Sequence, residues 1–346
     1  MKRASLLTAC ALSLLSAVGC GPDFDKSNEI KTLRVLGVQK DKPYAQPGEE
    51  VKLQLLWHDP KGRTDVQRAF VGGCVNPAGD LFYACFPQFA ELAAKGTLPF
   101  QAGDTFSVTL PDDIISSRRD EVAPGQPPNG LYIVFFAVCA GTLSFDMSAS
   151  AGTTGSEGLP IRCLDDQGKP LGSDDFVVGY SSIYSFEDAK NTNPTFVVDG
   201  GQTKFEVAGH SLTADCVGAA CQGTPPVEVD CDAEPERCVA ACADDGDASC
   251  PDIEVKPDIE QRVELDDVST QLFGTDTPEQ MWVNYYVDHG GISEVRLVND
   301  AKSGWNEKYR GELHAPKDAG PLQIWAVVHD NRGGMDFTRI TLGVKK

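Results

Sequence analysis

The stretch that decides the fold is Val51-Lys52-Leu53-Gln54-Leu55-Leu56-Trp57, in which apolar and polar side chains alternate from Val51 to Leu55. A period of two places alternate side chains on opposite faces of a strand, so one face can be buried. A turn with Pro47 and Gly48 precedes the stretch, and a charged turn at residues 59–63 follows it. The pattern therefore predicts a half-buried β-strand between two turns.

The same alternation of strand and turn signals continues along the chain. Residues 131–139 hold no charge and predict a central strand buried on both faces. Residues 176–186 predict a further strand, with Val177, Tyr180, Ile183 and Tyr184 as packing residues. Two hairpins are expected, one pairing residues 281–287 with 292–298 and one pairing 322–328 with 337–344, whereas the best helix covers residues 87–95.

The order of strand, Pro-Gly turn and alternating strand resembles the opening of an immunoglobulin-like β-sandwich, of the kind found in tandem in bacterial surface lipoproteins. The last two strands resemble the closing hairpin of immunoglobulin-like or cadherin-like modules. A length of 346 residues suits two domains. We therefore expect an all-β protein with two immunoglobulin-like β-sandwich domains, residues 30–193 and 194–346, the second carrying a disulfide-rich acidic insertion at residues 211–262.

A weak internal repeat relates residues 53–62 to residues 324–333. His58-Asp59 and His329-Asp330 each follow an apolar strand and precede a basic residue and a glycine. Either the two domains are related, or two strand-to-turn junctions use the same residue types independently.

The N-terminus has the features of an export signal. Met1-Lys2-Arg3 is followed by an apolar run at residues 4–18, which is shorter than the roughly 20 residues that span a bilayer. Ala17-Val18-Gly19-Cys20 resembles the lipobox of bacterial lipoproteins, which prefers leucine where Ala17 stands. Leu7-Thr8-Ala9-Cys10 matches by letter, but too few apolar residues precede it. We favour Cys20; the alternative is an ordinary signal peptide that leaves Cys20 as a thiol.

The lipobox resemblance implies a signal peptide at residues 1–19 and a lipidated tether at residues 20–29, with covalent lipid on Cys20. Gly21, which is not aspartate, implies sorting to the outer membrane, with the domains in the periplasm or exposed at the surface. Removal of residues 1–19 takes away Lys2 and Arg3 and no acid, so the net charge of −21 becomes −23.

The ten cysteines after Cys20 fit the oxidising compartment that an export signal implies, and we expect disulfides. Cys74 and Cys85 form a natural local pair around turn residues, and Cys139 with Cys163 would tie a strand to a later segment. Zinc is disfavoured because only Cys238 and Cys242 have a spacing typical of its ligands. The pairing of the six cysteines in the insertion stays open: Cys216, Cys221, Cys231, Cys238, Cys242 and Cys250.

The acidic charge restricts the partners. A pI near 4.5 argues against nucleic acid and against electrostatic binding to anionic lipid. Residues 211–262 hold thirteen acids and three bases, a net −10 in 52 residues, with almost no large apolar side chain. We therefore expect disulfides to order this segment, either as a rigid display loop or as a solubilising decoration.

The sequence contains no motif typical of an enzyme. His58-Asp59 and His329-Asp330 could belong to a Ser-His-Asp catalytic site with a serine from elsewhere in the chain. However, the sequence contains no G-x-S-x-G motif, and Gly179-Tyr180-Ser181-Ser182 matches that motif only in part. Metal-hydrolase, P-loop and dinucleotide-binding patterns are also absent from the sequence. We predict that the protein is not an enzyme; the alternative is an exported hydrolase with an unrecognised carboxylate or Ser-His site.

Calcium is the ion that the acidic loops would suit. Asp244, Asp245 and Asp247 offer hard oxygen ligands, but Val255 stands at the twelfth position, where an EF-hand needs glutamate. We expect no cofactor and no dedicated metal site, with a calcium-stabilised surface module as the alternative. The predicted function is a lipid-anchored, non-catalytic binding, adhesion or assembly module, whose partners are other envelope proteins or surface glycans.

Overall fold

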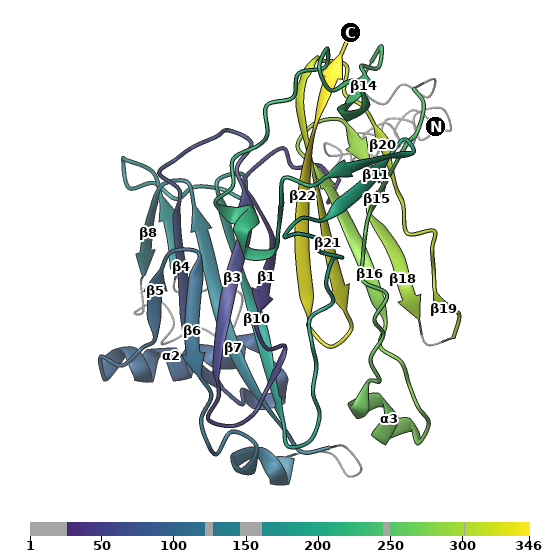
Figure 1. The fold of residues 1–346 in the computed structure, drawn as a ribbon. Coiled ribbons are helices and arrows are strands. Elements are labelled where there is room, and N and C mark those ends of the chain that lie inside the picture. Colours follow the sequence, from purple (N-terminus) through teal and green to yellow (C-terminus); the bar gives the residue numbers. More distant parts are fainter. Residues whose placement is uncertain (1–25, 122–126, 146–160, 245–249, 301) are drawn as a thin grey trace, which may run out of the picture.

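The computed structural model describes residues 26–121, 127–145, 161–244, 250–300 and 302–346. Two pairs of β-sheets follow one another along the chain and stand side by side, and the long strands β7, β10, β21 and β22 lie along a similar axis (Figure 1). The predicted fold class is confirmed: the fold is all-β, with sandwiches of the immunoglobulin-like kind and five disulfides.

The first sandwich packs a three-stranded sheet against a five-stranded one. The three-stranded sheet has the order β1-β3-β6, and the stretch that opened the sequence analysis forms β3. The five-stranded sheet has the order β2-β10-β7-β4-β5, and a small β8-β9 hairpin lies beside it. The bounds are β1 Arg34–Lys40, β2 Tyr44–Ala45, β3 Glu50–His58, β4 Gln67–Val75, β5 Phe100–Ala102, β6 Thr105–Thr109, β7 Asn129–Cys139, β8 Thr142–Phe145, β9 Ile161–Leu164 and β10 Phe176–Phe186.

Strand β7 is buried on both faces, as the uncharged run predicts. Val134 and Phe136 contribute to the core between the two sheets. Ile133 and Phe135 point to the other face, where helix α2 (Cys85–Ala94) covers them. The predicted helix is thus present. It packs on the outer face of the sheet and is attached to β4 by the Cys74–Cys85 disulfide. Three short 3-10 turns lie near it: η2 Ala78–Asp80, η3 Phe82–Ala84 and η4 Ser116–Glu121.

The second sandwich packs a five-stranded sheet, β12-β11-β15-β20-β17, against a larger one, β13-β22-β21-β16-β18-β19, to which β14 adds alongside β22. The bounds are β11 Lys204–Val207, β12 His210–Thr213, β13 Cys216–Val217, η6 Gly218–Gln222, η7 Pro235–Arg237, β14 Cys238–Ala240, β15 Ile253–Pro257, α3 Asp267–Phe273, β16 Met281–Val287, β17 Gly291–Ile292, β18 Val295–Asp300, β19 Gly304–Trp305, β20 Gly311–His314, β21 Gly320–Asp330 and β22 Met335–Lys345.

The two predicted hairpins are present, with one difference. β21 and β22 pair along their length around the turn at residues 331–334. β16 pairs with β18, but the intervening β17 leaves this sheet, because Ile292 pairs with Leu313 of β20 in the opposite one. The chain therefore crosses the sandwich briefly between the two arms of the predicted hairpin.

The acidic insertion at residues 211–262 differs from the expected loop. Segments of it form strands of the second sandwich, including β14 and β15. Leu212, Val239, Val255 and Ile259 are buried in the main core of that sandwich. Disulfides are therefore not the only elements that order this segment: a few well-spaced apolar residues join a core that neighbouring strands supply.

A separate apolar cluster joins the two sandwiches. Leu36 of β1 and Leu56 of β3 face Trp325, Val327, Met335 and Phe337 on the outer face of β21 and β22, and Ile30 and Cys221 complete the cluster. The ring of His58 lies 4.5 Å from the ring of Trp325, measured between centroids. The outer face of one sheet in each sandwich is therefore buried, as in a continuous core.

The connection between the sandwiches is tied to both of them. Asn193, at the predicted boundary, donates from its side chain to the Lys40 carbonyl at 2.6 Å and accepts from the Met335 amide at 2.9 Å. Asn191 donates to Asp330 at 3.0 Å. Each contact fixes the linker against an element of the interface, so the linker does not act as a free hinge.

The segment before β1 belongs spatially to the second sandwich. The Ile30 amide donates to the Val287 carbonyl at 2.7 Å, and the Val287 amide donates to the Asn28 carbonyl at 2.9 Å. Ser27 donates to Glu294 at 2.9 Å. The chain thus pairs with the end of β16 first and enters the first sandwich afterwards.

Trp325 tests the cluster between the sandwiches. Its side chain is 2% exposed, so we expect Trp325→Ala to lower the free energy of unfolding by about 3–5 kcal/mol, as in other truncations of large buried side chains. Phe273→Ala, on a side chain 72% exposed in α3, is the matched control and should change it by less than about 0.5 kcal/mol. Urea denaturation measures both, and a Trp325→Ala value equal to the control would contradict a buried interface.

Candidate binding surface

Six exposed apolar or aromatic side chains lie on strand β10 and at turn η3, and ring contacts join Phe82 to Tyr83 and to Tyr180. We call this group the aromatic surface; Tyr83 and Tyr180 are its most exposed members, at 54% and 49%. Exposed apolar groups scattered singly are ordinary, but a contiguous set typically marks an interaction site. Its members are Leu81, Phe82, Tyr83, Val178, Tyr180 and Tyr184.

Strand β10 and turn η3 position these side chains. Val178, Tyr180 and Tyr184 have even residue numbers in β10 and share one face of the strand. Ile183 has an odd number, and its side chain is buried in the core between the sheets. Tyr180 is paired in register with Phe135 of β7. Alternation along a strand therefore places the tyrosines on the outer face.

Phe82 brings η3 onto this face. Its ring stacks on that of Tyr180, with centroids 5.2 Å apart and planes at 19°. It also contacts the edges of Phe86 and Phe135 at 6.4 and 6.5 Å. Because Cys85 follows η3 directly and is bonded to Cys74 of β4, the disulfide restrains the turn that carries Phe82 and Tyr83.

Polar groups border the aromatic surface near Tyr184. Arg118 forms an ion pair with Asp80 at 2.8 Å and donates to the Asn129 side chain at 3.1 Å. Partial burial raises the pKa of Tyr184, and the Asp80 carboxylate adds to the shift. The Tyr184 hydroxyl therefore stays protonated at neutral pH and can donate a hydrogen bond, while the rings of the surface offer flat apolar faces.

The prediction that Tyr180 and Tyr184 are packing residues of this strand is wrong. Both are exposed, whereas Ile183 is fully buried. Strict alternation around Ile183 would have put them on the opposite face. A second signal of an exposed segment is the Leu81-Phe82-Tyr83 triplet, which directly follows the turn residues 76–80.

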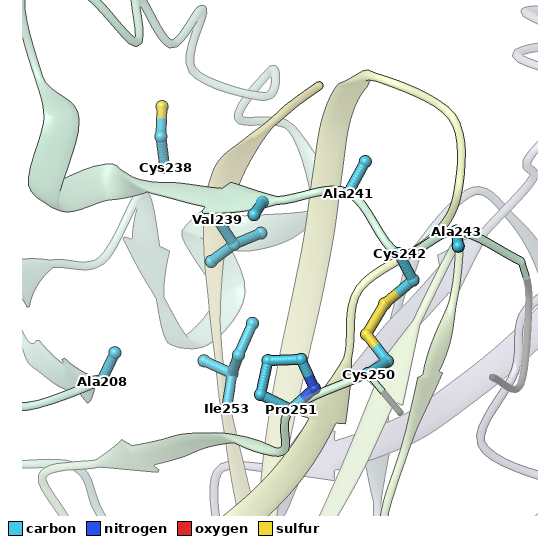
Figure 2. Close-up of a pocket in the computed structure, with 10 residues that line it drawn as sticks. Ala208, Cys238, Val239, Ala241, Cys242, Ala243, Cys250, Pro251 and Ile253 are labelled. Atoms are coloured by element: carbon cyan, nitrogen blue, oxygen red, sulfur yellow. A yellow bond between two sulfur atoms is a disulfide. The ribbon is translucent and has the colours of Figure 1, made fainter. Parts of the chain in front are cut away.

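A shallow cavity lies beside the insertion, with a volume of about 390 Å³ (Figure 2). Val239 and Ile253 form its apolar wall, and the Cys242–Cys250 disulfide and Pro251 border it. Its remaining lining consists of alanines and Cys238. The lining residues include no charged side chain, so the cavity offers little to orient a polar ligand.

The described cysteines form five local disulfides. Cys74 pairs with Cys85 and Cys139 with Cys163, the two pairs that the sequence favoured. In the insertion, which the sequence left open, each cysteine pairs with the next along the chain: Cys216 with Cys221, Cys231 with Cys238, and Cys242 with Cys250. These three bonds join residues within the insertion. Cys216 lies in β13 and Cys238 in β14, and both of these strands pair with β22.

The His-Asp pairs serve packing and turns. The rings of His58 and His329 lie against Trp325 and Trp282 respectively, at centroid distances of 4.5 and 5.4 Å. Burial lowers the pKa of both histidines, to about 4 for His329. Neither ring is hydrogen-bonded to a serine among the described residues, and the structure does not bring the two histidines into one site with Ser181.

The aspartates of these pairs cap the turns that follow them. Asp59 accepts from the amides of Lys61 and Arg63, at 3.3 and 3.1 Å. Asp330 accepts from the amides of Arg332 and Gly334, at 2.8 and 2.7 Å. However, β3 leads to the opposite sheet, whereas β21 turns back into its own. The repeat thus reflects shared turn chemistry and not equivalent positions in the two sandwiches.

Several predicted site residues lie outside the described residues: Cys20, Asp245, Asp247, the signal peptide and most of the tether. Asp244 is described and is exposed. Over the described ranges, no group of three or more metal-ligating side chains comes together. The same ranges include no helix long and apolar enough to cross a membrane.

Comparison with known proteins adds little to this geometry. No protein-family model and no curated protein matches the chain. Among solved structures, the chain is similar to the native conformation of Escherichia coli alpha-2-macroglobulin, with 10% sequence identity and a TM-score of 0.21. The match covers 92% of this chain and 17% of that one. Fold and disulfides thus define the class: an all-β, disulfide-bonded protein with two sandwiches.

The buried ring of His329 predicts a pH-dependent contribution to stability. A histidine in an unfolded chain titrates near about 6.5, whereas the folded protein holds the pKa of His329 to about 4. The unfolded state therefore binds more protons between these values, and the contribution of the neutral ring, complete above pH 7, is lost as the pH falls towards 4.

We expect the free energy of unfolding of wild type minus that of His329→Gln to fall by about 2 to 3 kcal/mol between pH 7 and pH 4. Asp336, whose pKa burial raises to about 6, acts in the opposite direction, but it is present in both proteins and cancels in the difference. Denaturant titrations across this range provide the measurement. A difference that does not depend on pH would refute the assignment of a neutral, buried imidazole.

Proposed function

We propose that this protein is a lipid-anchored, non-catalytic binding module of a bacterial cell envelope, held at the outer membrane by lipid on Cys20. The aromatic surface is the observation that carries the binding role. Aromatic side chains are enriched at protein interfaces because a ring buries a large apolar area at a low cost in side-chain entropy. Tyr83 and Tyr180 remain about half exposed in the folded chain and are available for such a contact.

The rigid aromatic surface and the engaged His-Asp pairs favour a binding role over a catalytic one. The stacked rings of Phe82 and Tyr180 rest on a sheet that α2 and a disulfide make rigid. A preordered surface loses little conformational entropy on binding, so more of the contact energy contributes to affinity. Both His-Asp pairs are engaged in packing and in turn capping, which leaves them poorly placed to act as general bases.

The envelope location is supported by two independent features. Five disulfides are typical of a protein that folds outside the cytoplasm. The N-terminal sequence supplies a basic start, an apolar run and Cys20 in a lipobox-like setting. Lipid on Cys20 would then hold the two sandwiches at the membrane through a short tether.

Substitution of Cys20 tests the anchor. We expect Cys20→Ser to abolish incorporation of a fatty-acid analogue and to move the protein from the membrane fraction to the soluble fraction, because the acyl chains supply the membrane affinity. Cys10→Ser, which alters the other lipobox-like cysteine, is the matched control and should leave both readouts unchanged. Full labelling of Cys20→Ser, or loss of labelling in Cys10→Ser, would contradict lipidation at Cys20.

A further inference from the structure

Strand β6 forms an open edge of the three-stranded sheet in the first sandwich. It is five residues long, Thr105-Phe106-Ser107-Val108-Thr109, and contains no charged residue, no proline and no bulge. Natural proteins usually protect an exposed strand edge with one of these features, or with a very short strand, because an open edge can pair with another chain. β6 has none of these protections.

The other sheet edges are short or covered. β2, β13, β17 and β19 have two residues each, β5 and β14 have three, and β8 and β9 have four. β1 is bulged at Leu36, which packs against the second sandwich. In β12 the Thr213 carbonyl accepts from Arg237, and along β18 the Leu297 carbonyl accepts from Asn306. Within the described chain, β6 is therefore the longest edge strand without such cover.

The hydrogen-bond pattern shows which backbone groups of β6 are unused. At the two ends of the ladder with β3, the Leu55 amide donates to the Asp104 carbonyl at 2.8 Å and the Leu110 amide donates to the Glu49 carbonyl at 2.9 Å. The register between these ends is unbroken, so even-numbered residues bond to β3 and odd-numbered residues face away from it. No described residue bonds to the backbone groups on this free side, which belong to Thr105, Ser107 and Thr109.

The facing sheet has an uncovered position on the same side of the sandwich. Gln101 of β5 lies directly opposite Phe70 of β4, and directly opposite residues of an antiparallel pair point to the same face. Phe70 is fully buried between the two sheets, whereas the inward-facing Gln101 is exposed. The three-stranded sheet therefore ends before it covers β5. Both β5 and β6 lie on the side of the first sandwich that faces away from the second (Figure 1).

These features define the chemistry of an occupant. The free N–H and C=O groups of β6 recur at every second residue, and an extended peptide backbone presents partners at the same spacing. On the inner face the added strand would lie beside the buried Phe106 and Val108, which favour apolar β-branched neighbours. On the outer face it would lie beside the hydroxyl side chains of β6, which favour threonine or serine.

We propose that β6 binds an extended, uncharged segment of another protein, which adds as an antiparallel fourth strand and alternates β-branched apolar residues with threonine or serine. The antiparallel direction continues the pairing of the sheet and is the more stable of the two. The aromatic surface lies on β10 and η3, and β7 and β4 separate β10 from β5 in the facing sheet. The edge is therefore a second binding site, and it does not depend on the lipid anchor.

The test uses the detergent-solubilised full chain and the peptide Ac-Gly-Thr-Val-Thr-Val-Thr-Gly-NH2. In the proposed register the threonine N–H groups point to β6 and the valine N–H groups point away. N-methylation of the threonines should therefore weaken binding at least about tenfold, whereas N-methylation of the valines, the matched control, should change it by less than about threefold. Equal binding of the three peptides, or the opposite order, would overturn the proposal.

Hydrogen exchange followed by NMR locates the contact. The free-side amides of Ser107 and Thr109 should exchange rapidly in the free protein and slow at least about tenfold when the peptide is bound, because only then do they have an acceptor. The amides of Phe106 and Val108, which bond to β3, should be protected in both states and are the internal control. Unchanged exchange at Ser107 and Thr109 with about 1 mM peptide would refute strand addition at β6.

Substitution of Ser107 tests the edge from the protein side. Ser107→Pro removes a free-side N–H that does not bond to β3, so it should weaken the peptide at least about tenfold while the ladder is kept. Ser107→Ala keeps the N–H and should stay within about threefold. Ser107→Lys, which places a charge on the edge and leaves the backbone unaltered, gives the same test if the proline variant does not fold. Wild-type affinity in Ser107→Pro or Ser107→Lys would contradict the site.

A second copy of the chain is the other occupant that an open edge admits. Self-association in sedimentation experiments that Ser107→Pro or Ser107→Lys abolishes would assign the edge to pairing between two copies, and would overturn the foreign segment. A monomeric chain that binds the peptide with the expected N-methylation pattern supports the proposal.

Discussion

The contact between the two sandwiches determines the shape of the whole molecule. Leu36 and Leu56 of the first sandwich contact Trp325 and Phe337 of the second in a buried apolar cluster. Each sandwich therefore covers a sheet face of the other that would otherwise be exposed. Burial of this apolar area is the driving force, and the linker bonds of Asn193 fix the angle. The two sandwiches are thus packed together as one unit.

The fold could be predicted from the sequence because strand alternation and turn residues are local signals. β3, β7 and the β21-β22 hairpin follow from period-two patterns, uncharged runs and Gly-rich turns. The course of the insertion could not be predicted in this way. Val239 and Val255 are isolated valines in an acidic segment, and only β22 and β20, distant in sequence, make them part of a core.

The same limit applies to the candidate site. A tyrosine is compatible with a core and with an exposed recognition surface, so composition alone does not distinguish Ile183 from Tyr184. Alternation alone places Ile183 and Tyr184 on opposite faces of β10, but which of these faces is the core depends on the long-range packing of its sheet. The six cysteines of the insertion could not be paired from the sequence either, because their spacing allows several connectivities, and only the structure shows that each pairs with the next along the chain.

The rigid contact also explains why chain order and spatial order differ. The first described residues bind the edge of β16 before the chain enters the first sandwich, so the chain reaches its first domain by way of the second. A flexible linker would let the first sandwich fold back towards the bilayer, but the apolar cluster between the sandwiches opposes that motion. The packing of Trp325 and Phe337 therefore fixes where the rings of Tyr180 and Phe82, which neither residue touches, lie relative to the second sandwich.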